Sequence, residues 1–217
     1  ERDNMGWSTT EKKLESENIY HRYLNLPFDI TKHPVCDTQP EGMYHQELNP
    51  WLCKNLNNFL GEMGLFINDV VAYYTPPNGF LPIHVDGNKI DNRSKINITW
   101  GPKGGTTRWW SHNKSKNMAN VGEIFKGNKE ILDNIKNKHN WFPAKKDCEL
   151  LYEASTNKVS LVNVGQLHST YNPHPTKGRW TLCFVPISHK LKNDLGRSHL
   201  TFKESLEAFG PYIKESK

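Results

Sequence analysis

The chain has 217 residues, and its 28 lysines and arginines against 23 acidic residues give a formal net charge of +5. Acidic residues are interspersed with the lysines and no block of five or six like charges occurs, so a nucleic-acid partner is not favoured. No run of 18 apolar residues and no charged-then-apolar leader is present, which predicts a soluble, cytoplasmic protein without a membrane segment.

The first part of the chain predicts an irregular start followed by one helix. Residues 8–23 are polar and helix-compatible, and four prolines then break the chain, so residues 1–50 are expected to form a wrap around the rest. Apolar residues recur at helical spacing over residues 51–63, and Gly61 and Gly64 end the pattern. We therefore expect a helix packed against a sheet.

From residue 70 on, short apolar stretches of strand character follow one another, separated by turn residues. Strands are predicted at 70–74, 81–86, 95–101, 106–111, 149–155, 159–164, 167–172 and 179–187. Many short strands of this kind predict a mainly β fold with flanking helices and a sandwich or barrel of jelly-roll type.

The length fits a single domain over residues 1–217. We expect it to comprise an N-terminal wrap and supporting helix (1–69), a core (70–187) and a C-terminal extension (188–217). The core is interrupted by an insertion (112–147), which is rich in Asn and Lys and has a possible short helix around residues 129–138. This insertion is equally compatible with a lid over a site and with a solvated surface excursion.

His84, Asp86 and His168 say most about function. In a β-strand, residues i and i+2 point to the same face, so His84 and Asp86 can hold one ion from a single extended segment. His168 lies in a second strand-like run and can supply a third ligand. A single strand histidine is more often a hydrogen-bonded structural residue, but two imidazoles and a carboxylate together form the set that holds Fe(II) on one side.

Arg179 opens the next predicted strand, eleven residues after His168. With this His-x-Asp, distant His and Arg pattern, residues 70–187 resemble the Fe(II)- and 2-oxoglutarate-dependent dioxygenases. The stretches 81–87, 96–100, 107–110 and 161–163 look more closely like a group of oxygenase-like proteins from marine microbes and their viruses. The resemblance implies a double-stranded β-helix core of jelly-roll, cupin-like type. It also implies Fe(II), 2-oxoglutarate as cosubstrate and O2, with hydroxylation of a substrate and release of succinate and CO2.

The resemblance also implies how the cosubstrate is held. Arg179 would grip its distal carboxylate with a planar guanidinium, and a hydroxyl neighbour would complete the grip. Tyr74, ten residues before His84, is the best match, and Tyr73 is the register alternative, because strand alternation turns one inward and the other outward. Asn97 is either an amide that bonds the cosubstrate inside the barrel or a solvent-facing strand residue.

Arg108 and Trp109, together with Tyr73, are candidates to line the substrate pocket. The alternative is that the tryptophans cap the core. The substrate is expected to be a small molecule or a peptidyl group, and the sequence does not identify it. Two other classes fit the same three ligands. One is a cupin-type metalloprotein acting as an isomerase or hydrolase, and the other is a non-catalytic, metal-dependent binding module.

Overall fold

The computed structural model describes residues 10–87, 90–112, 145–155 and 157–214. The strands are β1 (His21–Tyr23), β2 (Tyr44–Leu48), β3 (Phe66–Thr75), β4 (Phe80–His84), β5 (Ser94–Trp100), β6 (Thr106–His112), β7 (Cys148–Ser155), β8 (Ser160–Asn163), β9 (His168–Tyr171) and β10 (Arg179–Ile187). The helices are α1 (Thr10–Tyr20), α2 (Lys54–Glu62), α5 (His189–Leu195) and α6 (Phe202–Ala208), with short 3-10 turns η1 (Pro34–Asp37), η3 (Lys145–Asp147) and η4 (Gly210–Tyr212). No helix in these described ranges is long and apolar enough to cross a membrane.

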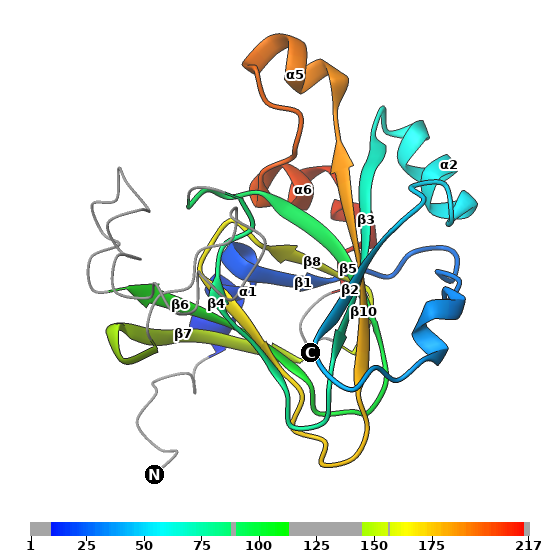
Figure 1. The fold of residues 1–217 in the computed structure, drawn as a ribbon. Coiled ribbons are helices and arrows are strands. Elements are labelled where there is room, and N and C mark those ends of the chain that lie inside the picture. Colours follow the sequence, from blue (N-terminus) through cyan, green and yellow to red (C-terminus); the bar gives the residue numbers. More distant parts are fainter. Residues whose placement is uncertain (1–9, 88–89, 113–144, 156, 215–217) are drawn as a thin grey trace.

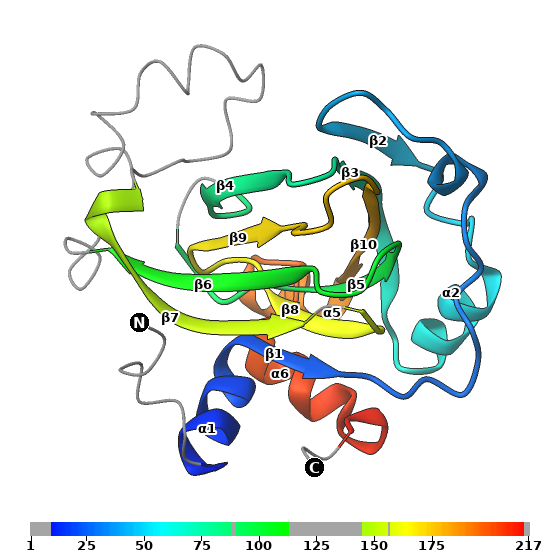
Figure 2. The same ribbon diagram turned by 90° about the horizontal axis from the view of Figure 1, so that it is seen from below.

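The strands form two antiparallel sheets. The large sheet has the order β1-β8-β5-β10-β3-β2, and the small sheet has the order β4-β9-β6-β7. From β3 onward the chain passes back and forth between them, with β3, β5, β8 and β10 in the large sheet and β4, β6, β7 and β9 in the small one. This alternation makes a double-stranded β-helix of jelly-roll, cupin-like topology, as predicted. Figure 2 shows the small sheet facing the large one.

The main hydrophobic core lies outside the barrel, between the large sheet and the helices. Helix α2 packs against β3 and α6 against β8, and both lie on the large-sheet side in Figures 1 and 2. The side chains buried in this core include Leu56, Leu60, Ala72, Ile96, Leu182, Phe184 and Phe202. Because successive strand residues point to opposite faces, the same strands present their polar residues to the barrel interior.

Most predicted elements are confirmed, with one correction near the N-terminus. The strand predicted at 179–187 has those bounds in the structure, and the predicted helix at 51–63 is α2. The region predicted as an irregular wrap, however, contributes β1 and β2 to the two edges of the large sheet. Strand β2 is exposed along most of its length, so it carries no apolar alternation that would reveal it. The possible helix at 129–138 lies outside the described residues.

Candidate metal centre

His84 and His168 lie side by side on neighbouring strands of the small sheet. The antiparallel register of β4 and β9 pairs the two residues directly, and their ring centroids are 4.3 Å apart. Asp86 follows just beyond the end of β4, where its backbone N–H donates to the Val164 carbonyl at 2.9 Å. One potential ligand atom from each of the three side chains lies within 4.8 Å of the others. The structure thus brings the predicted triad together.

A β-bulge turns His84 into the barrel. Leu81 pairs with Thr170 and faces the central cavity, so strict alternation would send Ile83 inward and His84 outward. One extra residue between Leu81 and His84 changes that parity, and Ile83 instead packs in a separate apolar cluster. Pro82 sits within the bulge, where its missing N–H costs no ladder hydrogen bond.

Backbone carbonyls fix which nitrogen of each imidazole faces the metal position. His84 Nδ1 lies 2.7 Å from the Pro82 carbonyl, and His168 Nδ1 lies 2.8 Å from the Gln166 carbonyl. Since a carbonyl only accepts, each Nδ1 carries the proton and each Nε2 keeps its lone pair for a metal. Burial, reinforced by the neighbouring His84, lowers the pKa of His168 to about 3, so its imidazole is neutral at physiological pH.

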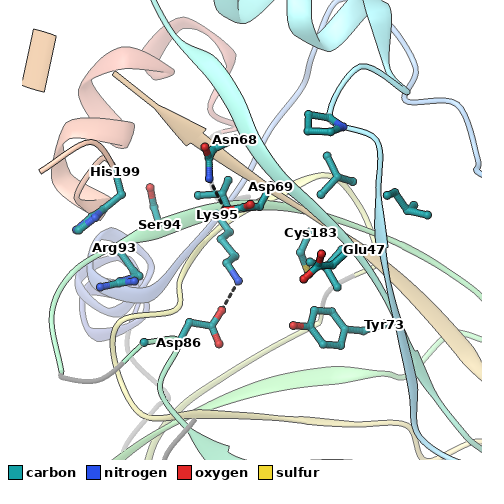
Figure 3. Close-up of a pocket in the computed structure, with 16 residues that line it drawn as sticks. Glu47, Asn68, Asp69, Tyr73, Asp86, Arg93, Ser94, Lys95, Cys183 and His199 are labelled. Atoms are coloured by element: carbon teal, nitrogen blue, oxygen red, sulfur yellow. Dashed lines mark hydrogen bonds and ion pairs between the residues drawn. The ribbon is translucent and has the colours of Figure 1, made fainter. Parts of the chain in front are cut away.

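Both carboxylate oxygens of Asp86 have close neighbours. Oδ1 lies 3.3 Å from His84 Nε2, and Oδ2 forms an ion pair with Lys95 of β5, drawn as a dashed line in Figure 3. Burial alone would raise the pKa of Asp86, but Lys95 and the two imidazoles hold it well below the usual range. Lys95 was not among the predicted site residues, although its alternation with Asn97 and Thr99 places all three on one face of the strand.

Arg179 lies in the same cavity as the triad, at the start of β10. Its Nη1 donates to the Tyr171 carbonyl at 3.4 Å and its Nη2 to Thr99 Oγ1 at 3.5 Å. Burial lowers the pKa of Arg179 to about 10, which still leaves the guanidinium charged at neutral pH. Gly105 leaves room for this group, because a Cβ there would lie 2.1 Å from Nη1.

Asn97 and Tyr73 are further polar residues that line this cavity of about 80 Å³. In the described part of the chain, Asn97 Oδ1 is buried and has no hydrogen-bond partner, so the cavity holds an unused polar atom that a ligand or water would satisfy. Burial raises the pKa of Tyr73 to about 12, which keeps its hydroxyl protonated as a donor. The donor set therefore fits a divalent metal, and its surroundings fit a polar ligand.

The structure corrects the prediction that Tyr74 contacts the cosubstrate. Tyr73 pairs with Thr181 and faces the cavity, whereas Tyr74 pairs with Trp180 and points to the other face of the sheet. There it is almost fully buried in the main core, with its ring 5.1 Å from that of Trp180. The register alternative, Tyr73, is thus the tyrosine beside the candidate metal centre.

Arg108 and Trp109 also lie elsewhere than expected, since neither borders the cavity. Arg108 is on the outer face of the small sheet, where it is ion-paired with Glu153 and lies 5.3 Å from the Tyr171 ring centroid. Trp109 points inward but is fully buried; its Nε1 donates to the Asn163 carbonyl at 2.9 Å, and its ring packs against Tyr152. Trp109 therefore fills one end of the barrel as core, in line with the alternative weighed above.

Comparisons with known proteins add distant structural similarity. No protein-family model and no curated protein matches the chain. HygX from Streptomyces hygroscopicus, solved with nickel and 2-oxoglutarate, is 8% identical with a TM-score of 0.46, covering 81% of this chain and 85% of its own. A viral collagen prolyl hydroxylase from Paramecium Bursaria Chlorella virus-1, in a 2-oxoglutarate complex, is 12% identical with a TM-score of 0.33, covering 68% of this chain and 80% of its own.

An oxalate oxidase in complex with glycolate is 13% identical with a TM-score of 0.34, covering 71% of this chain. The chain spans 59% of the length of that oxidase and 64% of a recombinant form.

Proposed function

We propose that this protein is an Fe(II)- and 2-oxoglutarate-dependent dioxygenase that hydroxylates its substrate. One observation carries the proposal: two imidazole Nε2 atoms and one carboxylate meet inside a double-stranded β-helix, in one cavity with a buried arginine. Two histidines and one carboxylate are the ligand set of non-haem Fe(II) oxygenases. The arginine suits a dicarboxylic cosubstrate, because a guanidinium fork matches a carboxylate.

Each residue has a definite task in this scheme. His84, Asp86 and His168 would hold the iron on one side, and the bound iron would supply the redox chemistry needed to use O2. Arg179 would bind the distal carboxylate of 2-oxoglutarate, with Tyr73 and Asn97 as hydrogen-bonding neighbours. The overall reaction converts a substrate C–H, 2-oxoglutarate and O2 into the alcohol, succinate and CO2, with one oxygen atom in the alcohol and the other in succinate.

Succinate formation tests the proposal. Purified protein reconstituted with Fe(II) under air should convert 2-oxoglutarate to succinate slowly even without its substrate, and His168→Ala should not. Anaerobic binding of 2-oxoglutarate to the Fe(II) protein should also produce the visible absorption band of a chelated 2-oxo acid. A wild-type protein that neither binds 2-oxoglutarate nor forms succinate would refute the proposal, in favour of a cupin-type metalloprotein or a binding module.

A further inference from the structure

A second cavity, of about 410 Å³, adjoins the candidate metal centre (Figure 3). Four residues, Tyr73, Asp86, Lys95 and Cys183, border both cavities, so a ligand in the larger one would lie directly beside Asp86. The volume falls in the range of about 300–1,000 Å³ that is usual for small-molecule sites. This cavity is therefore the place where a substrate can approach the metal position.

The basic side chains that line this second cavity are ion-paired with carboxylates. Arg93 donates from Nη2 to Asp91 Oδ2 at 2.7 Å and from Nε to the same oxygen at 3.0 Å. Lys95 is paired with Asp86, and His199 Nε2 lies 3.9 Å from Asp91 Oδ2. Because Arg93 and Lys95 are each matched by one carboxylate, they leave little net attraction for an anionic ligand.

Two other carboxylates on the cavity wall differ, because no described basic side chain forms an ion pair with them. Within the described part of the chain, Glu47 and Asp69 form no ion pair with a basic side chain; Asp69 accepts a hydrogen bond from Asn68 Nδ2 at 2.5 Å. Glu47 of β2 pairs with Val71 of β3, and Asp69 lies two residues before Val71 on the same face. Such diagonal neighbours are about 7–8 Å apart, close enough for one cation to contact both side chains.

The cavity is thus negative on one side, although the whole chain has a net charge of +5. Figure 3 shows Glu47 on the side opposite Arg93 and His199, with Lys95 and Asp86 between them. Apolar side chains also line the cavity, among them Val71 and Val185. An aliphatic stem that ends in a cation would match these features.

We propose that this cavity binds the substrate, and that the substrate presents a compact cationic group, an alkylammonium or a guanidinium, to Glu47 and Asp69. This inference rests on the proposed function. The aliphatic carbons next to the cation would then lie against the valines and reach toward Asp86, where a C–H bond can be hydroxylated. The cation belongs either to a free amine or amino acid or to a basic side chain of a peptide.

Direct binding to the Ni(II)-loaded protein, measured by calorimetry, tests the charge preference without turnover. The probes are butylamine and butylguanidine as cations, 1-butanol as the neutral match and butyrate as the anion. The two cations should bind about tenfold or more tightly than 1-butanol, because a hydrogen bond to a charged group is worth considerably more than a neutral one. Butyrate should bind more weakly than 1-butanol.

Substitutions at Glu47 and Asp69 test whether these two carboxylates cause the preference for cations. Glu47→Gln and Asp69→Asn should each weaken butylamine binding by about tenfold, whereas Glu62→Gln on the exposed face of α2 makes the same charge change away from the cavity and should have no effect. The inference is overturned if no cation binds, if butyrate binds as well as butylamine, or if both cavity variants keep wild-type affinity.

Two further experiments distinguish a free amine or amino acid from a peptide side chain, and the cavity assignment from the proposed function. Stimulation of succinate formation by L-lysine or L-arginine identifies a free amino acid, and stimulation only by a capped Ala-Lys-Ala or Ala-Arg-Ala peptide identifies a peptidyl side chain. If cations bind but the Fe(II) protein does not bind 2-oxoglutarate, the proposed function fails and the cavity assignment stands. If 2-oxoglutarate binds and no cation does, the reverse holds.

Discussion

Replacing Gly105 by alanine should weaken 2-oxoglutarate binding without unfolding the protein. The added Cβ would lie 2.1 Å from Arg179 Nη1 and 2.6 Å from its Cζ, both far inside contact distance. The backbone of Gly105 does not have a positive φ, so alanine is tolerated there and the guanidinium must move instead. Displacing it removes at least one charge-assisted hydrogen bond to the cosubstrate, which costs about 2 kcal/mol, or roughly 30-fold in the Kd of 2-oxoglutarate.

The assay is an anaerobic titration of 2-oxoglutarate into the Fe(II) protein, with the melting temperature recorded for each variant. Gly61→Ala on α2 is the matched control, because a Cβ there meets nothing within 4 Å, and it should bind 2-oxoglutarate as the wild type does. Arg179→Lys should weaken binding as Gly105→Ala does, since an ammonium cannot make the bidentate contact. A folded Gly105→Ala protein with wild-type affinity would show that the observed position of Arg179 is not the one that binds the cosubstrate.

Two further predictions concern stability. Burial lowers the pKa of His21 to about 3, so the unfolded chain binds a proton that the folded chain excludes between that pH and about 6.5. The free energy of unfolding is therefore unaffected by His21 above pH 6.5 and falls by up to about 5 kcal/mol as the pH is lowered toward 3. Denaturant unfolding of His21→Leu should show a smaller loss of stability over this pH range. An unchanged pH dependence would contradict the assignment to His21. Thr201 caps α6 through a reciprocal pair of hydrogen bonds with Glu204. Thr201→Ala should therefore lower the free energy of unfolding by about 1 kcal/mol in chemical denaturation, whereas Thr201→Ser, the conservative control, should keep it. A Thr201→Ala protein of unchanged stability would show that the cap is not needed.

The strand series and the metal triad could be predicted because their signals are local. Apolar runs between turn residues mark the core strands, and His84, Asp86 and His168 stand out by residue type and spacing. The edge strands were missed because an exposed strand such as β2 needs no apolar residues. Only the partner strand reveals it.

The choice between Tyr73 and Tyr74 could not be made from the sequence, because two adjacent tyrosines satisfy either parity. The pairing of β3 with β10 decides it, by placing Tyr73 opposite Thr181. Lys95 was missed for a different reason. A lysine on a strand is usually exposed, and only the folded barrel brings Asp86, nine residues earlier, close enough to hold its charge inside.

The bulge before His84 makes the metal site depend on a residue count as well as on residue types. If the same residues of β4 paired regularly with β9 beyond Leu81, Ile83 would lie opposite His168 and the His84 imidazole would turn to the outside of the barrel, while Leu81 kept its place. A chain paired in that way would contain every ligand that the triad needs, yet it would present only part of the triad to a metal. A one-residue slip between these two strands is therefore enough to dismantle the candidate metal centre without any substitution.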